Sequence, residues 1–239
     1  MVDNDRDSTI HMEDPSTFIN NSYKAIVRSD TNELISIVKD SYKLVRNQEL
    51  IDSLFRELAT LSYAFKIDSR HSFVENAQMR LQIIFPELLL HDSQSDIAFG
   101  ISLFNSYDQS LGVRCEFSGL RKICENGLVL RSMLSRFYGK HTSGFSFGLG
   151  EKLEEAKMFF PDIQERINRL EHLRVTEELV EQVSDRISKR LAEKVIEDNE
   201  IFRLSQWDLL NRITNHISHQ IEPRLQNNYQ QAVSKLFAI

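Results

Sequence analysis

The sequence predicts an α+β fold, in which an antiparallel sheet with packed helices is followed by a helical C-terminal third. Between residues 77 and 117, apolar and polar side chains alternate with the period of two that half-buried strands show. Only short polar connections separate these runs, which suits antiparallel pairing and excludes the long crossovers that parallel strands need. After Gly150 the apolar residues recur at steps of three and four instead, which is the spacing of helices.

The composition limits the class of protein. A chain of 239 residues, of which 41% are hydrophobic, can bury a sizeable core in one large domain or two small ones. Apolar stretches such as residues 81–90 fall short of the roughly 20 residues that span a bilayer, so no membrane partner is expected. Two cysteines, Cys115 and Cys124, do not make a disulfide framework, which favours a cytoplasmic location.

Three regions are indicated by the change of pattern along the chain. Residues 1–20 are acidic, contain no apolar core segment and are expected to be a disordered tail, not a signal peptide. Residues 21–150 form the predicted α+β sheet domain, and residues 151–239 form the helical region. The boundary falls in the glycine-rich segment 143–150.

The first predicted elements are a hairpin and a helix. Residues 23–27 and 34–38 are β-prone and flank a polar loop, which predicts a hairpin. Asn47 is then a good N-cap for a helix whose apolar residues recur at helical spacing as far as Leu61. A short strand is expected over residues 63–67.

Further strands come next. The alternation of residues 77–85 predicts a half-buried strand that ends at Pro86, because proline cannot donate to the ladder. A second hairpin is expected from strands 97–103 and 111–117, joined by the polar turn 105–110. In its second strand Cys115 shares the apolar face with its neighbours at alternate positions and is predicted to be buried.

The remaining predicted elements are helical. One helix is expected over residues 126–139, with Asn126 as its N-cap. Residues 151–160 predict a helix that breaks near Pro161, and Ser205 with Asp208 can start a further helix. A four-residue apolar repeat lies between these two regions: Leu179, Val183, Ile187, Leu191 and Val195.

The glycines single out one part of the chain as a site. All 8 glycines lie between Gly100 and Gly150, and so do both cysteines. This window carries six basic and three acidic residues, whereas the whole chain has a net charge of −6. Glycine is needed where φ is positive or where another group approaches the backbone closely, and binding residues concentrate on such irregular segments.

The candidate nucleic-acid contacts are basic and aromatic residues of this window: Arg114, Arg121, Lys140, His141, Phe145 and Phe147. Phe145 and Phe147 are placed either to stack on unpaired bases or to anchor a loop to the core. Arg114 faces away from Cys115, so it is either a solvated charge or part of a basic surface that meets an anion. The residues expected to shape the presenting loops are Asn105, Asp108 and Asn126.

The sequence evidence for other groups of reactive residues is weaker. Cys124 and His141 would suit a nucleophilic pair if they met in space, while Cys124 equally suits the core. His216 and His219 have a spacing that can place both near one metal, but no further ligand completes a site, so no metal is assigned. Neither the Walker spacing nor the dinucleotide glycine fingerprint is present, and no cofactor is indicated.

Six segments carry a family resemblance: SYKAIVRSD at 22–30, YKLVRN at 42–47, NSYDQS at 105–110, RKICENGL at 121–128, HT at 141–142 and WDLLNRIT at 207–214. In this order they resemble the landmarks of the phage/plasmid-like family of unknown function, number nine hundred and thirty-two. The resemblance implies a gene of a phage, plasmid or integrated element and no established activity. Gln109 and Lys140 depart from the family, whose members tend to have glycine and arginine there. Lysine keeps the charge of arginine but loses its planar fork.

Three functions stay open at this point. The first is a non-enzymatic nucleic-acid-binding protein of a mobile element, in DNA recombination or replication, with single-stranded DNA as one candidate ligand. The second is an enzyme in which His141 transfers protons and Arg114, Arg121 or Lys140 holds an anionic substrate. In the third, the apolar stripes of the helical third assemble a homo-oligomer. The basic window and the implied mobile element favour the first.

Overall fold

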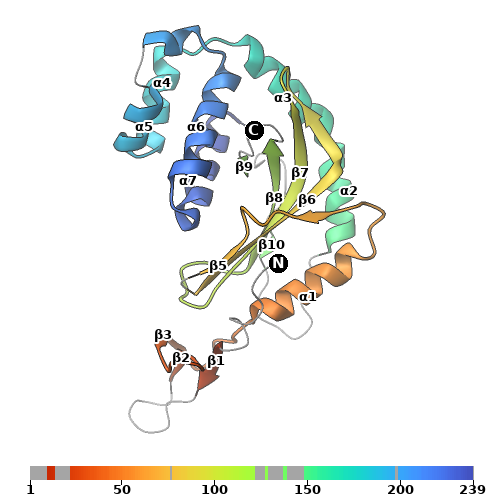
Figure 1. The fold of residues 1–239 in the computed structure, drawn as a ribbon, viewed down its shortest axis with the longest axis vertical. Coiled ribbons are helices and arrows are strands. Elements are labelled where there is room, and N and C mark those ends of the chain that lie inside the picture. The colour runs from red at the N-terminus through yellow and green to blue at the C-terminus, as the bar shows by residue number, and fades with distance from the viewer. Residues whose placement is uncertain are drawn as a thin grey trace.

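The computed structural model describes residues 10–13, 22–75, 77–121, 127–128, 137–138, 148–196 and 199–238. These residues form two antiparallel sheets and a set of helices that dominates the C-terminal part, so the predicted α+β class is confirmed (Figure 1). None of the described helices has the length and apolar character needed to cross a membrane.

A three-stranded sheet stands at one end of the molecule (Figure 1). Its central strand β2 (Tyr23–Arg28) pairs with β3 (Leu34–Lys39), which confirms the first hairpin. On its other edge β2 pairs with β1 (Ile10–Glu13), so a strand lies within the segment that was expected to be a disordered tail. The physical reason is the open edge of β2, whose unpaired N–H and C=O groups offer a ladder to a nearby extended segment.

The second sheet has seven strands, with the main order β10-β8-β7-β6-β4, while β5 pairs with β6 and β9 with β8. Its strands are β4 (Lys66–Ile67), β5 (Phe73–Glu75), β6 (Gln78–His91), β7 (Asp96–Ser106), β8 (Arg114–Arg121), β9 (Gly127–Leu128) and β10 (Phe137–Tyr138). The antiparallel β6-β7-β8 meander confirms the predicted alternation. The strand expected over residues 63–67 shrinks to the two residues of β4.

Pro86 does not end its strand, contrary to the prediction. Strand β6 continues to His91, and its register against β7 shifts between Phe85 and Leu89. Pro86 therefore lies in an irregular stretch of the ladder, where a residue without an N–H is tolerated because no regular ladder hydrogen bond is required of it.

The helix expected over residues 126–139 is wrong at the described positions. Gly127 and Leu128 form β9, and Phe137 and Tyr138 form β10, both paired with β8. The outer edge of β8 offers backbone hydrogen bonds to both segments, and this long-range pairing outweighs a weak local helix preference.

Seven α-helices are described: α1 (Asn47–Leu58), α2 (Leu149–Met158), α3 (Phe160–His172), α4 (Glu177–Arg186), α5 (Lys189–Ile196), α6 (Gln206–Gln220) and α7 (Pro223–Leu236), with a 3-10 turn at Asn199–Arg203. The break near Pro161 separates α2 from α3 as predicted. The Ser205 hydroxyl accepts from the Asp208 N–H at 3.0 Å, and the Asp208 carboxylate accepts from the Ser205 N–H, so the capping box of α6 is confirmed.

Both faces of the seven-stranded sheet are covered. Figure 1 shows α2 and α3 along one side of the long strands and α6 and α7 along the other. The centre of the Phe99 ring in β7 lies 5.0 Å from that of Phe160 in α3 and 5.1 Å from that of Phe117 in β8. Cys115 lies on this apolar face and is 1% exposed, as predicted, and burial raises the pKa of its thiol. One continuous apolar cluster runs from α1 through the sheet to α7.

Candidate functional site

The turn between β7 and β8 meets the segment that leads into α1. Asn105 donates from Nδ2 to the Val45 carbonyl oxygen at 3.0 Å and to Asn47 Oδ1 at 2.8 Å. The Tyr107 hydroxyl accepts from the backbone N–H of Asn47 at 2.7 Å. Asn47, Asn105 and Tyr107 are all buried. Two of the segments that carry the family resemblance are therefore one unit in space, although about 60 residues separate them.

This contact also corrects the predicted role of Asn47. Helix α1 begins at Asn47 itself, with Arg46 in the N-cap position and no side-chain cap. The Asn47 side chain and N–H are engaged by Asn105 and Tyr107 instead. Long-range hydrogen bonds thus satisfy groups that a local cap would otherwise serve.

The turn is closed by Asp108. Its carboxylate accepts from the Ser110 N–H at 2.9 Å and from the Ser110 hydroxyl. Burial raises the pKa of the Asp108 carboxyl, but hydrogen bonds, those from Ser110 foremost, outweigh burial and hold that pKa below its ordinary value. Gln109 has a φ of 63°, a left-handed conformation that glycine adopts more easily.

A cationic groove lies beside this turn. Its volume is about 520 Å³, and it is lined by Lys24, Asp40, Ser41, Tyr42, Lys43, Leu44 and Arg46. Lys24 Nζ pairs with an Asp40 carboxylate oxygen at 3.1 Å. Lys43 and Arg46 are exposed, and neither makes an ion pair with any residue that the structure describes. Burial and the nearby Asp108 carboxylate raise the pKa of Tyr42, so its hydroxyl remains a donor at neutral pH.

The three-stranded sheet also has an exposed face with an aromatic residue, on the opposite side of the sheet from Lys24 of the groove. Tyr23 lies directly opposite Lys39 in the β2–β3 ladder, and Ile37 lies two residues before Lys39. Tyr23 is 45% exposed and Ile37 is 57% exposed. An aromatic ring beside a lysine on an open sheet face is suited to stacking on a base whose phosphate meets the cation.

Arg114 lies on the second face of the seven-stranded sheet, which is not open to solvent. Arg80, Phe104 and Arg114 are aligned across β6, β7 and β8. The guanidinium carbons of Arg80 and Arg114 lie 5.6 and 4.4 Å from the centre of the Phe104 ring. Arg114 Nε is 3.6 Å from a Glu116 carboxylate oxygen, and the two side chains are only 12% and 5% exposed. Arg114 is therefore not the solvated charge that one interpretation expected.

Arg80 is a fully buried cation of this face. Burial lowers the pKa of its guanidinium to about 10, while the carboxylates of Asp68 and Glu116 oppose the shift. Arg80 consequently stays charged at neutral pH, with its charge favoured by the nearby carboxylates and by the face of the Phe104 ring.

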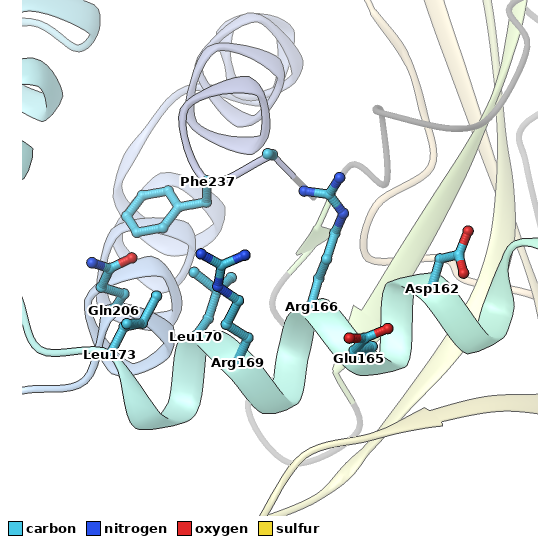
Figure 2. Close-up of a pocket in the computed structure, with 9 residues that line it drawn as sticks. Asp162, Glu165, Arg166, Arg169, Leu170, Leu173, Gln206 and Phe237 are labelled. Atoms are coloured by element: carbon cyan, nitrogen blue, oxygen red, sulfur yellow. The ribbon is translucent and has the colours of Figure 1, made fainter.

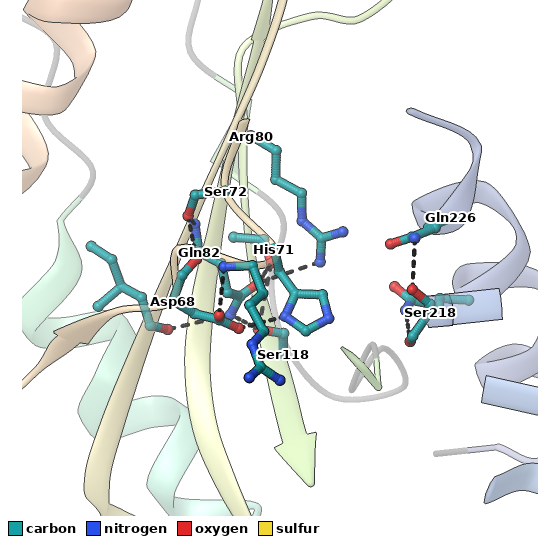
Figure 3. Close-up of polar contacts among 12 residues, drawn as sticks. Asp68, His71, Ser72, Arg80, Gln82, Ser118, Ser218 and Gln226 are labelled. Carbon is teal, nitrogen blue, oxygen red and sulfur yellow. Dashed lines mark hydrogen bonds and ion pairs between the residues drawn. The ribbon is translucent and has the colours of Figure 1, made fainter. Parts of the chain in front are cut away.

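A row of buried hydrogen bonds lies next to Arg80 (Figure 3). Ser102 donates to Gln82 Oε1, and Gln82 Nε2 donates to Ser118 Oγ at 2.8 Å. Glu116 accepts from Gln231 Nε2 of α7 at 2.9 Å. This second face is thus a buried polar layer that ties the sheet to α7.

A histidine–carboxylate pair borders the polar layer. His71 Nδ1 lies 2.5 Å from Asp68 Oδ2, and both side chains are nearly buried (Figure 3). Ser72 Oγ donates to the Asp68 carbonyl oxygen at 2.7 Å and accepts from the Gln82 N–H at 2.9 Å. Burial raises the pKa of the Asp68 carboxyl, but the hydrogen bond and charge of His71 outweigh burial and lower it overall.

The lowered pKa makes the acid stability of the fold depend on Asp68. Its carboxylate stabilises the fold above the ordinary pKa of 3.8, and this contribution is lost as the pH falls through the lower folded-state pKa. We expect urea unfolding midpoints to drop less between about pH 5 and pH 2 in Asp68→Asn than in the unchanged chain. Asp30→Asn, an exposed control, should keep the original slope. An unchanged slope in Asp68→Asn would contradict the assignment.

Several predicted site residues lie outside the described residues: Lys140, His141, Phe145, Phe147, Asn126 and Cys124. Arg121 ends β8, but its side chain is likewise outside them. That Arg121, Lys140 and His141 contact nucleic acid stays a prediction.

His216 and His219 of α6 are not joined by further potential metal ligands among the described residues. Burial and the neighbouring charge of Lys194 lower the pKa of His216. Among the residues with described placement, no group of three or more His, Cys, Asp or Glu side chains is arranged to hold a metal ion.

The sequence-based site set missed the cationic groove and the polar layer. Lys43 and Arg46 belong to a segment that carries the family resemblance, so their charge was available as a signal. Arg80 and Gln82 alternate with apolar neighbours, which predicts a solvated face, and nothing local shows that this face is buried.

The comparisons with known proteins identify a family but no activity. A family model described as "Domain of unknown function (DUF932)" matches residues 34–239. No curated protein and no solved structure matches the chain.

Proposed function

We propose that the chain binds nucleic acid. It belongs to the DUF932 family, whose function is unknown, so its function has to be inferred from its own residues. The proposal is of a non-enzymatic protein that serves DNA recombination or replication of a phage, plasmid or other mobile element. The observation that carries it is the cationic groove, in which Lys43 and Arg46 are exposed beside Tyr42.

The charge distribution supports this proposal. Residues 22–47 hold five basic and three acidic side chains, a net charge of +2, in a chain whose net charge is −6. Clustered cations attract the phosphate backbone even when the whole protein is acidic. Lys43 and Arg46 are available for phosphates because no described carboxylate pairs with them.

The exposed face of the three-stranded sheet supports single strands as the ligand. Tyr23 and Ile37 are exposed on the same small sheet whose other residues help to line the groove. Unpaired bases can stack on an exposed ring, whereas bases within a duplex are already stacked on each other. We therefore expect single-stranded DNA to bind more tightly than duplex DNA of equal length.

The test is a salt series of binding to labelled single-stranded and duplex oligonucleotides. In the Lys43→Glu, Arg46→Glu double variant we expect affinity for single strands to fall at least about tenfold. The slope of log affinity against log salt should flatten by about 1.4, the value for two lost phosphate contacts. The matched control is Arg186→Glu with Lys189→Glu, two exposed cations with the same spacing on α4 and α5.

Two outcomes would contradict the proposal. One is the absence of binding by the unchanged chain near 50 mM salt, where phosphate contacts are strong. The other is an equal loss of affinity in the control variant, which would reflect net charge and not the groove.

A further inference from the structure

A second hollow, of about 490 Å³, lies where α3 passes the start of α6 and the end of α7. Its lining includes Arg166, Arg169, Leu170, Leu173, Gln206 and Phe237 (Figure 2). We propose that this hollow binds a phosphate monoester of nucleotide size, with its phosphate on the two arginines and its organic part against the apolar residues.

The two arginines supply the anion site. Arg166 and Arg169 are one helical turn apart, and their guanidinium groups both rise from α3 toward Phe237 (Figure 2). Asp162 and Glu165 precede them by four residues, a spacing that favours ion pairs, yet no ion pair joins either couple in the described structure. Within the described part of the chain, two cations without carboxylate partners therefore face one hollow, and guanidinium forks match the oxygens of a phosphate.

The rest of the lining suits the organic part of the ligand. Leu170 and Phe237 form a buried apolar floor, and Leu173 is 38% exposed beside them. Gln206 donates from Nε2 to the Arg174 carbonyl oxygen at 3.1 Å, which holds its amide at the edge of the hollow. The volume falls within the range of about 300–1,000 Å³ of sites that take small molecules.

This site is separate from the cationic groove. The groove belongs to the segment between β2 and α1, whereas the hollow lies at the far end of the molecule, beside α3 and α6 (Figure 1). A free nucleotide and the phosphorylated end of a strand share the chemistry that the arginines recognise. The two sources differ only at the 3′ side of the sugar, where a strand continues and a free nucleotide ends.

The experiment is calorimetric titration of the full chain with adenosine 5′-monophosphate, adenosine, inorganic phosphate and a dinucleotide with or without a 5′-phosphate. We expect the monophosphate to bind and adenosine to fail. Affinity should drop at least about tenfold in Arg166→Gln with Arg169→Gln, because two charge-assisted contacts are lost. Arg186→Gln, an exposed arginine of α4, is the matched control and should bind like the unchanged chain.

The outcomes separate this proposal from the proposed function. The Lys43→Glu, Arg46→Glu variant should keep its affinity for the monophosphate, whatever happens to its binding of oligonucleotides. Tighter binding of the phosphorylated dinucleotide than of the monophosphate would support a strand end as the source, and the reverse order a free nucleotide. Binding that survives the double arginine variant, or no binding of any phosphorylated probe, would overturn the proposal.

Discussion

Replacing Gly100 with alanine is expected to lower the free energy of unfolding by about 3 kcal/mol. The new Cβ would lie 2.3 Å from the carbonyl oxygen of Ile83 and 3.0 Å from Gln82 Nε2. The first of these atoms is backbone in the middle of β6, where Ile84 pairs with Gly100. Relief of the clash therefore requires the β6–β7 ladder to separate, which no side-chain rotation can avoid.

The measurement is urea unfolding followed by circular dichroism. Gly112→Ala is the matched control, because a Cβ at Gly112 would meet nothing within 4 Å, and its effect should stay within about 0.5 kcal/mol. Alanine often stabilises a protein where the backbone tolerates it, so the two substitutions are expected to differ clearly. Equal stability of the two variants would show that the close approach of β6 to β7 does not require glycine at position 100.

Asn105→Ala is expected to cost about 3 kcal/mol as well, for a different reason. The substitution removes two hydrogen bonds, to the Val45 carbonyl oxygen and to Asn47 Oδ1, at a side chain that is 1% exposed. Asn47 is buried too, so its amide oxygen would lose its partner without gaining water. The loss should also loosen the attachment of the cationic groove, whose last residue, Arg46, directly precedes Asn47.

A double-mutant cycle tests this interpretation. Unfolding energies of Asn105→Ala, Asn47→Ala and the double variant should give a coupling of at least about 1 kcal/mol. Asn168→Ala, an exposed asparagine of α3, should change stability by less than about 0.5 kcal/mol. Additive effects of the two buried asparagines would exclude a direct interaction between them.

Much of the fold could be predicted because its signals are local. The alternation of residues 97–103 and 111–117 requires only that one sheet face be apolar, and the structure confirms both strands. The capping box of Ser205 and Asp208 depends on residues three apart, and it is present at the start of α6.

The candidate site was less accessible to such reasoning. The turn 105–110 was correctly placed in a hairpin, but its bonds reach Val45 and Asn47, far away in the sequence. Nor does the spacing of Arg166 and Arg169 reveal that they share a hollow with Phe237. Contacts of this kind arise only after the helices have packed.

The sequence by itself determined the class of the fold, the order of most strands and helices, and the burial of Cys115, because hydrophobic periodicity records which side of each element leaves water. Only the tertiary structure decided that β9 and β10 complete the edge of β8, that Arg80, Glu116 and their polar neighbours are buried, and that Gln231 of α7 bonds to Glu116. An edge of unpaired backbone groups and a covered polar face are both created by the approach of distant segments. Their free energies therefore depend on contacts that no local pattern of residues contains.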